Sequence, residues 1–293
     1  MGVNEQLPSP DSQMALVDQM IGEILSKSKG LSSAQIDSIL EHQKQTGARF
    51  GEAAITLGVV QSEDVLYALA QQFHYPYSPV SKQNLNAELI TAAQPYSKQV
   101  EVFRAIRGQL LLKVFNKLGV KRSLAIISPN RNDGKSYFAA NIAVVLSQLG
   151  GKTLVIDADM RAPRLHEIFG VTNNTGLSGI LSGRSSEQAI CAVPDLPSLF
   201  LLPSGPIAPN PIELIERPAF SILMTELVAK FDYVIVDTPA GTHGADAAAI
   251  SFKCGAALCI ARQGNSQKSG FTELIESIAS DSVELVGVIA NEY

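Results

Sequence analysis

Ser128-Pro129-Asn130-Arg131-Asn132-Asp133-Gly134-Lys135-Ser136 is the stretch of this 293-residue chain that decides its fold. The apolar run 124–127 before it predicts a buried strand, and residues 137–149 after it predict an amphipathic helix. A strand, a tight loop ending in Gly-Lys-Ser, and a helix form the arrangement in which backbone N–H groups surround phosphate groups. The sequence therefore predicts a phosphate-binding loop (P-loop), although Pro129 stands where the bare motif has its first glycine.

Two more apolar runs predict buried strands that end in acids. The run Lys-Thr-Leu-Val-Ile-Asp-Ala-Asp ends in Asp157 and Asp159, and Phe-Asp-Tyr-Val-Ile-Val-Asp ends in Asp237. The carboxyl ends of neighbouring parallel strands meet at the edge of the sheet where such folds bind ligands. Oxygen ligands there suit Mg²⁺ bound to phosphates, so Ser136, Asp157 and Asp237 are the expected metal-binding residues.

Composition narrows the class of protein. The net charge of −5 offers no basic surface for nucleic acid, and no apolar run reaches the length of about eighteen residues that crosses a bilayer. The three cysteines show no metal-ligand spacing and suit small buried side chains in a reducing compartment. Residues 1–13 are polar and predict a flexible tail and not a secretion signal.

Strand and helix patterns alternate from the P-loop to the C-terminus. Such alternation predicts an α/β domain, a P-loop NTPase with a doubly wound, mostly parallel sheet, over residues 97–293. Further strands are expected at 199–202, 256–261 and 285–290, and further helices at 220–230, 245–252 and 270–279.

An internal repeat lies ahead of this domain. The two halves align without gaps and share a glycine near the start and a glutamine at the end: residues 20–43 and 49–72, with Gly22/Gly51 and Gln43/Gln72. Neither half could bury its apolar face alone, so we expect one small all-α domain over residues 14–78. A polar, proline-containing linker is expected over residues 79–96.

The motifs of the nucleotide site resemble those of the bacterial tyrosine kinases (BY-kinases) of polysaccharide export. The family's motif of two apolar residues followed by Asp-x-Asp-x-Arg is matched by residues 155–161. The family's Glu-x-x-Arg-x-x-Arg helix is matched by Glu101, Arg104 and Arg107, for which an intrahelical ion pair with a solvated arginine is the simpler explanation. The resemblance covers residues 97–293.

The resemblance implies an ATP-dependent protein-tyrosine autokinase, a transferase that uses Mg²⁺ and regulates exopolysaccharide chain length or export. Lys135 would polarise the outer phosphates, and Asp159 would accept the proton of the tyrosine hydroxyl. Asp157 and Asp237 would support the metal ion, and most of the catalysis would come from positioning and charge neutralisation. The other expected nucleotide-binding residues are Asn132, Asp133, Gly134, Ser136, Tyr137, Arg161 and, near adenine, Asn291.

The resemblance also implies partners. The helix with Glu101, Arg104 and Arg107 would dock on a neighbouring subunit in a homo-oligomeric ring. A membrane polysaccharide copolymerase would activate the kinase through its cytoplasmic tail and recruit this cytoplasmic protein to the inner membrane. The family usually ends in a cluster of tyrosines, whereas Tyr293 is the only tyrosine after Tyr233. An ATP-driven oligomeric switch without tyrosine phosphorylation is therefore an alternative function.

The helical repeat resembles the N-terminal domain of type II secretion and pilus ATPases, in the variety called MshEN that binds cyclic di-GMP. This second resemblance implies a cyclic-di-GMP-sensing regulator of polysaccharide synthesis, and a docking or spacer domain is the alternative. Met20 stands where the first motif has an arginine, a residue that would supply hydrogen-bond donors for guanine and phosphate. The expected ligand contacts are Gly22, Gln43, Arg49, Gly51 and Gln72.

Overall fold

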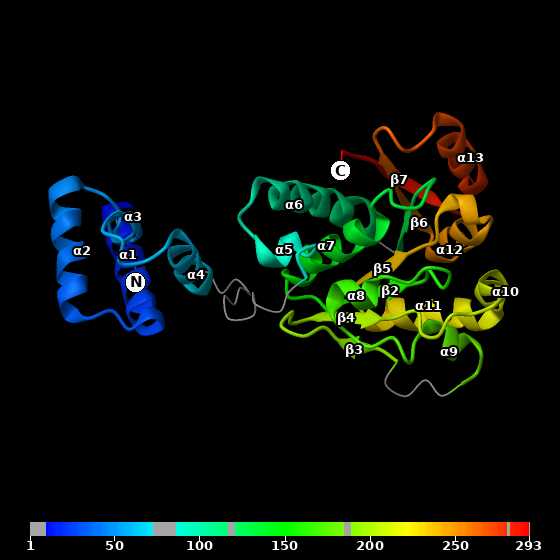
Figure 1. The fold of residues 1–293 in the computed structure, drawn as a ribbon, viewed down its shortest axis with the longest axis horizontal. Coiled ribbons are helices and arrows are strands. Elements are labelled where there is room, and N and C mark those ends of the chain that lie inside the picture. The colour runs from blue at the N-terminus through cyan, green and yellow to red at the C-terminus, as the bar shows by residue number, and fades with distance from the viewer. Residues whose placement is uncertain (1–9, 73–85, 117–120, 185–188, 280–281, 293) are drawn as a thin grey trace, which may run out of the picture. The chain divides into compact units, whose positions relative to one another are not determined.

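The chain folds into two compact units, residues 1–80 and 81–293, in a computed structural model that describes residues 10–72, 86–116, 121–184, 189–279 and 282–292 (Figure 1). No helix in these described ranges combines the length and the apolar character that crossing a bilayer requires. Tyr293, the tyrosine nearest the C-terminus, lies outside the described residues, as do residues 79–85 of the expected linker.

The first unit is helical, which confirms the expected all-α region. Its described helices are α1 (Pro10–Lys29), α2 (Ser33–Thr46), α3 (Phe50–Thr56) and α4 (Ser62–Gln72). Leu25, Ile39 and Phe50 lie in its core, where the apolar faces of the two repeat halves meet. Because α1 begins at Pro10, residues 10–13 belong to a helix and not to the tail that the sequence predicts.

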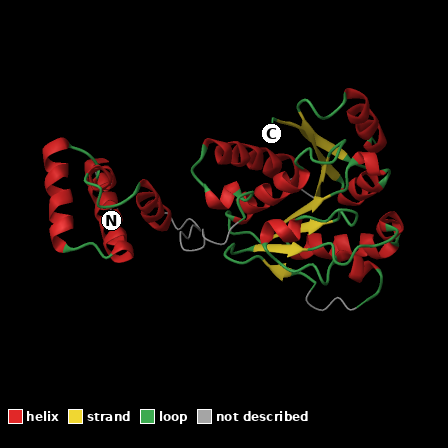
Figure 2. Cartoon of the chain, in the orientation of Figure 1, coloured by secondary structure: helices red, strands yellow, loops and turns green. Residues whose placement is uncertain are grey.

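The second unit contains one seven-stranded sheet, whose strands are yellow in Figure 2. The strand order is β3-β4-β2-β5-β1-β6-β7. Every neighbouring pair is parallel except β3 with β4, so the predicted doubly wound, mostly parallel sheet is confirmed. The strands are β1 (Leu124–Ile127), β2 (Thr153–Asp157), β3 (Cys191–Ala192), β4 (Leu199–Leu202), β5 (Tyr233–Asp237), β6 (Ala256–Arg262) and β7 (Glu284–Asn291).

Helices cover both faces of this sheet, which explains why its central strands are apolar throughout. One face packs against α5 (Ile90–Ala93), α6 (Lys98–Leu110), α7 (Lys135–Ser147) and α8 (Leu165–Phe169). The other face packs against α9 (Leu177–Leu181), α10 (Pro211–Glu216), α11 (Pro218–Lys230), α12 (Asp246–Cys254) and α13 (Lys268–Ile278). Helix α6 continues into a wider π-type turn over Leu111–Phe115.

Residues 86–96 differ from the expected linker because they are anchored in the second unit. The backbone N–H of Thr91 and its hydroxyl both donate to Asn141 Oδ1 in α7, at 3.0 and 2.8 Å. In return, Asn141 Nδ2 donates to the backbone carbonyl of Glu88 at 2.8 Å. Leu89 is 1% exposed within the same core, so α5 is an integral part of the second unit.

We expect Asn141→Ala to destabilise the full chain by roughly 2–4 kcal/mol, because it strands the buried Thr91 N–H without an acceptor. Urea denaturation followed by circular dichroism measures this loss. Gln148→Ala is the matched control, since the bond from Gln148 to the Thr91 carbonyl is longer, at 3.3 Å, and only partly buried. If Asn141→Ala lowered the free energy of unfolding by less than about 1 kcal/mol, α5 would not be an integral part of the second unit.

Candidate active site

The P-loop joins the end of β1 to the start of α7, as the sequence predicts. Asn132 has a φ of 63° and Gly134 a φ of 99°, two left-handed residues that wrap the loop around a central space. A Cβ at Gly134 would also collide with Nδ2 of Asn291, so this position requires glycine. Lys135, the first residue of α7, is only 7% exposed.

Three loops outside the P-loop fix its shape. Asp133 is fully buried, and its two carboxylate oxygens accept from Asn130 N and Asn265 Nδ2, each at 2.8 Å. Asn291 Nδ2 donates to Asp133 O at 2.9 Å, and Arg262 Nη1 donates to Asn132 O at 3.2 Å. On the other side, the N–H groups of Gly241 and Thr242 donate to the carbonyls of Ser128 and Pro129, at 2.8 and 3.0 Å. The loop is therefore preorganised.

Asn265 and Arg262 were missed by sequence reasoning. Arg262 ends β6 and Asn265 follows it, far from the loop in the chain, and no local pattern distinguishes them from other residues. The parallel pairing of β6 with β1 is what brings their segment to the P-loop.

The two buried acids predicted at strand ends are direct neighbours. Asp157 in β2 and Asp237 in β5 are register partners, and both are 0% exposed. Both carboxylate oxygens of Asp157 accept hydrogen bonds from backbone N–H groups. Oδ1 accepts from Asp159 at 3.2 Å, and Oδ2 accepts from Arg164 and Leu165, each at 3.0 Å. Its carboxylate thus organises the chain that follows β2.

Asp237 is different, because neither of its buried oxygens accepts a well-formed hydrogen bond from the described residues. Burial raises the pKa of Asp237 to about 7, although the Lys135 charge and the Ser136 hydroxyl lie close enough to lower it. Burial also raises the pKa of Asp157 well above its ordinary value, and the neighbouring Asp237 raises it further. Two adjacent buried acids whose pKa values stay raised despite the Lys135 charge favour the binding of a further cation.

The donor set fits a magnesium ion carried by phosphates. Among the described residues, no three His, Cys, Asp or Glu side chains are grouped as a complete metal cage. Mg²⁺ in nucleotide sites characteristically takes one or two protein oxygens and fills its other positions with phosphates and water. The orphaned oxygens of Asp237, beside the Ser136 hydroxyl, match that requirement.

Asp159 and Arg161 lie on the segment that leaves β2. The Oδ1 atom of Asp159 accepts from Arg161 N and Ala162 N, at 3.2 and 2.9 Å. The Arg161 guanidinium, expected to contact the nucleotide, pairs instead with Asp246 of α12, at 2.7 Å from Nε to Oδ2. Its role toward the nucleotide stays a prediction.

Asn291, expected near adenine, lies at the edge of a cavity of about 390 Å³ beside the P-loop. The walls are largely apolar and come from α6, α7, β6 and β7, among them Val102, Tyr137 and Ile289. Gly134 also lines this cavity, so it opens onto the loop that is expected to hold the phosphates.

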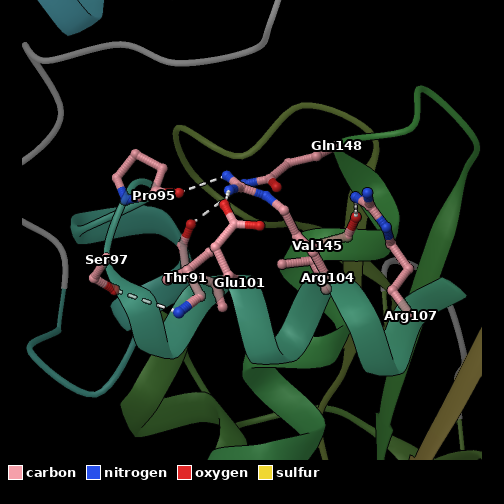
Figure 3. A network of polar contacts seen from close by, with 9 residues as sticks. Thr91, Pro95, Ser97, Glu101, Arg104, Arg107, Val145 and Gln148 are labelled. Carbon is pink, nitrogen blue, oxygen red and sulfur yellow. Dashed lines mark hydrogen bonds and ion pairs between the residues drawn. The ribbon is translucent and has the colours of Figure 1, made fainter.

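The three residues of the Glu-x-x-Arg-x-x-Arg motif make contacts within this chain (Figure 3). Arg104 pairs with Glu101 and also donates to the Pro95 carbonyl, while Arg107 Nη1 donates to Val145 O of α7 at 2.7 Å. The simpler expectation of a solvated arginine is therefore wrong for Arg107, which fastens α6 to α7. Glu101 itself has a side chain that is 63% exposed.

The residues expected to contact cyclic di-GMP lie on all helices of the first unit or next to them. Gln72, the last residue of α4, approaches Met20 of α1, with 4.0 Å between Nε2 and Sδ. Glycine is required at position 51 for packing, because a Cβ there would collide with Val65 of α4. Gly22 lies against the Phe50 ring, and Gln43 Nε2 donates to the Ala48 carbonyl at 3.3 Å. Arg49 precedes α3, and its N–H donates to Glu52 at 3.2 Å.

Known proteins resemble this chain over the greater part of its length, although no family model matches it. Tyrosine-protein kinase YwqD of Bacillus subtilis is 33% identical over 207 residues, which cover 71% of this chain and 86% of that protein. Tyrosine-protein kinase CpsD of Streptococcus agalactiae is 32% identical over 197 residues, 67% of this chain and 84% of that one. The crystal structure of the chimerical protein CapA2B2 superimposes with a TM-score of 0.65 at 36% identity, covering 71% of this chain and 91% of that one.

Proposed function

The chain belongs to the bacterial tyrosine-protein kinases, and on that premise we propose that it is an autokinase that transfers the γ-phosphate of ATP to tyrosines of its own kind. The observation that carries the proposal is the convergence of the P-loop, Asp157 and Asp237 at one edge of the sheet. Asp237 is buried there, and neither of its oxygens accepts a well-formed hydrogen bond from the described residues. Both oxygens are therefore available to a phosphate-bound cation.

Each residue then has a distinct part in phosphoryl transfer. Lys135 and the P-loop N–H groups hold the phosphates in place and neutralise their charge. Ser136 and Asp237 would hold the metal ion with Asp157 beside them, and Asp157 also fixes the chain after β2. Mg²⁺, when bound, supplies charge neutralisation at the transferred phosphate. Asp159, partly exposed beside this site, accepts the proton of the incoming tyrosine hydroxyl.

The adenine base is proposed to occupy the apolar cavity beside Gly134. The cavity volume of about 390 Å³ is ample for a purine base, and its apolar walls suit the faces of an aromatic ring. Asn291, which already holds the P-loop, would then border both the base and the phosphates.

The ring and the membrane copolymerase complete the proposal, with exopolysaccharide chain length as the regulated process. The Glu101 side chain is exposed on α6 and is available to another subunit. Because Arg104 and Arg107 also hold α6 within its own subunit, loss of assembly in their variants would not by itself identify a subunit contact. Cyclic-di-GMP binding rests on motif spacing alone.

Labelled ATP tests the proposal directly. We expect the full chain, incubated with γ-labelled ATP, Mg²⁺ and the cytoplasmic tail of a copolymerase, to acquire label on tyrosine, because the site is built to position a γ-phosphate. Tyr293→Phe should lower this label, and Tyr96→Phe serves as the matched control. Phosphate release with no labelled protein would instead establish the ATP-driven switch.

A further inference from the structure

Asp246, the first residue of α12, forms a two-point ion pair with Arg161 of the segment that leaves β2. Arg161 Nε donates to Oδ2 at 2.7 Å and Nη2 donates to Oδ1 at 3.2 Å. The Asp246 side chain is 3% exposed and that of Arg161 33% exposed. A planar guanidinium held at both carboxylate oxygens has one orientation, so the pair fixes direction as well as distance.

The backbone of the clamped arginine is what holds Asp159. The Arg161 N–H and the adjacent Ala162 N–H are the two donors to Asp159 Oδ1, at 3.2 and 2.9 Å. Met160, between Asp159 and Arg161, is 0% exposed and anchors the same segment in the core. Movement of the Arg161 side chain would therefore shift both N–H groups and with them the Asp159 carboxylate.

Asp246 lies next to a segment that holds the P-loop in place. It begins α12, directly after the segment whose Gly241 and Thr242 N–H groups donate to the carbonyls of Ser128 and Pro129. An acid in the first turn of a helix is also favoured by the helix dipole. The ion pair thus joins the segment after β2 to the start of α12, 85 residues later in the sequence.

We propose that Asp246 is a positioning residue: through its ion pair with Arg161, it fixes the Asp159 carboxylate relative to the P-loop for attack by the tyrosine hydroxyl. The inference rests on the proposed kinase function for its catalytic consequence, although the placement of the Asp159 segment can be tested without activity. A purely structural ion pair would affect folding stability and leave transfer by the folded enzyme unchanged.

Hydrogen–deuterium exchange of the full chain tests the placement. We expect Asp246→Asn to speed exchange of the Arg161 and Ala162 amides about tenfold or more, because their acceptor loses its fixed position. The matched control is Glu284→Gln, which breaks the ion pair of Glu284 with Arg122 at a similar 2.8 Å, outside the active site. Unchanged exchange at residues 161 and 162 would overturn the inference whether or not the chain is an active kinase.

Steady-state kinetics test the consequence, with a synthetic Glu–Tyr copolymer as the phosphate acceptor. Asp246→Asn should lower kcat about 10- to 100-fold while the KM for ATP changes less than about twofold, because the phosphates are held elsewhere. Asp246→Glu, which keeps the charge, should retain more activity, and Arg161→Lys combined with Asp246→Asn should be no worse than the poorer single variant.

The outcomes are distinguishable. An unchanged kcat, or equal losses in kcat and ATP affinity, would overturn the positioning role of Asp246. A wild-type enzyme that forms no phosphotyrosine on itself or on the copolymer would overturn the proposed function, and faster exchange at residues 161 and 162 would still uphold the clamp.

Discussion

Lys135→Ala is expected to reduce phosphotyrosine formation about a thousandfold or more, with the fold intact. Lys135 is buried at the start of α7, at the lysine position of the P-loop motif. Its charge also lowers the pKa of Asp237. The variant therefore loses a phosphate ligand and weakens the metal site together, and these effects multiply in the transition state.

Labelled ATP and a fluorescent ATP analogue measure this prediction, one for transfer and one for binding. Lys152→Ala is the matched control, because Lys152 is an exposed lysine just before β2, away from the P-loop. Circular dichroism establishes that both variants are folded. A Lys135→Ala enzyme that keeps more than a tenth of the wild-type rate would show that the phosphates lie elsewhere.

The core of this site was predictable because its signals are local. The P-loop, Asp157 and Asp237 each follow a short apolar run, and parallel pairing alone brings the ends of such strands together. β1 spans the predicted residues, while β2 and β5 are slightly shorter than predicted and still end at the predicted acids.

What the sequence could not predict depends on contacts between distant segments. Asp246 has no local feature that marks it as the partner of Arg161, and Asn265 contacts Asp133 only because two strands pair. The polar segment around Thr91 looks like a linker until Asn141 supplies the hydrogen bonds that bury it. Arg107 belongs to a motif that indicates a subunit contact, yet its guanidinium donates to a carbonyl of α7 in the same chain.

Asp237→Asn is expected to make the ligand-free protein more stable above neutral pH while abolishing its kinase activity. The pKa of Asp237 is about 7 in the folded chain, against a usual value of 3.8. As pH rises from about 4 to about 7, the unfolded chain has released this proton while the folded chain still holds it, so the free energy of unfolding falls. Above pH 7 the folded protein carries the full cost of a buried charge, on the order of 4 kcal/mol.

Asparagine cannot ionise, so the variant should lack this loss between pH 4 and pH 8. Removing the Asp237 charge also removes the repulsion that raises the pKa of Asp157, which adds to the stabilisation above neutral pH. Urea denaturation at pH 4.5 and pH 8 measures the effect: the two proteins should be alike at the lower pH and differ at the higher one. Asp232→Asn, an exposed acid at the other end of β5, is the control.

Mg·ATP should reverse the order of stability. The ligand stabilises the wild type by neutralising Asp237, whereas an asparagine offers the metal a weaker, uncharged ligand, so the thermal shift on adding Mg·ATP should largely disappear in the variant. An Asp237→Asn protein that is less stable than the wild type at pH 8, or that keeps its Mg·ATP shift and its activity, would contradict this account. The buried charge that weakens the empty fold is, on this argument, what gives the site its affinity for a phosphate-bound metal ion.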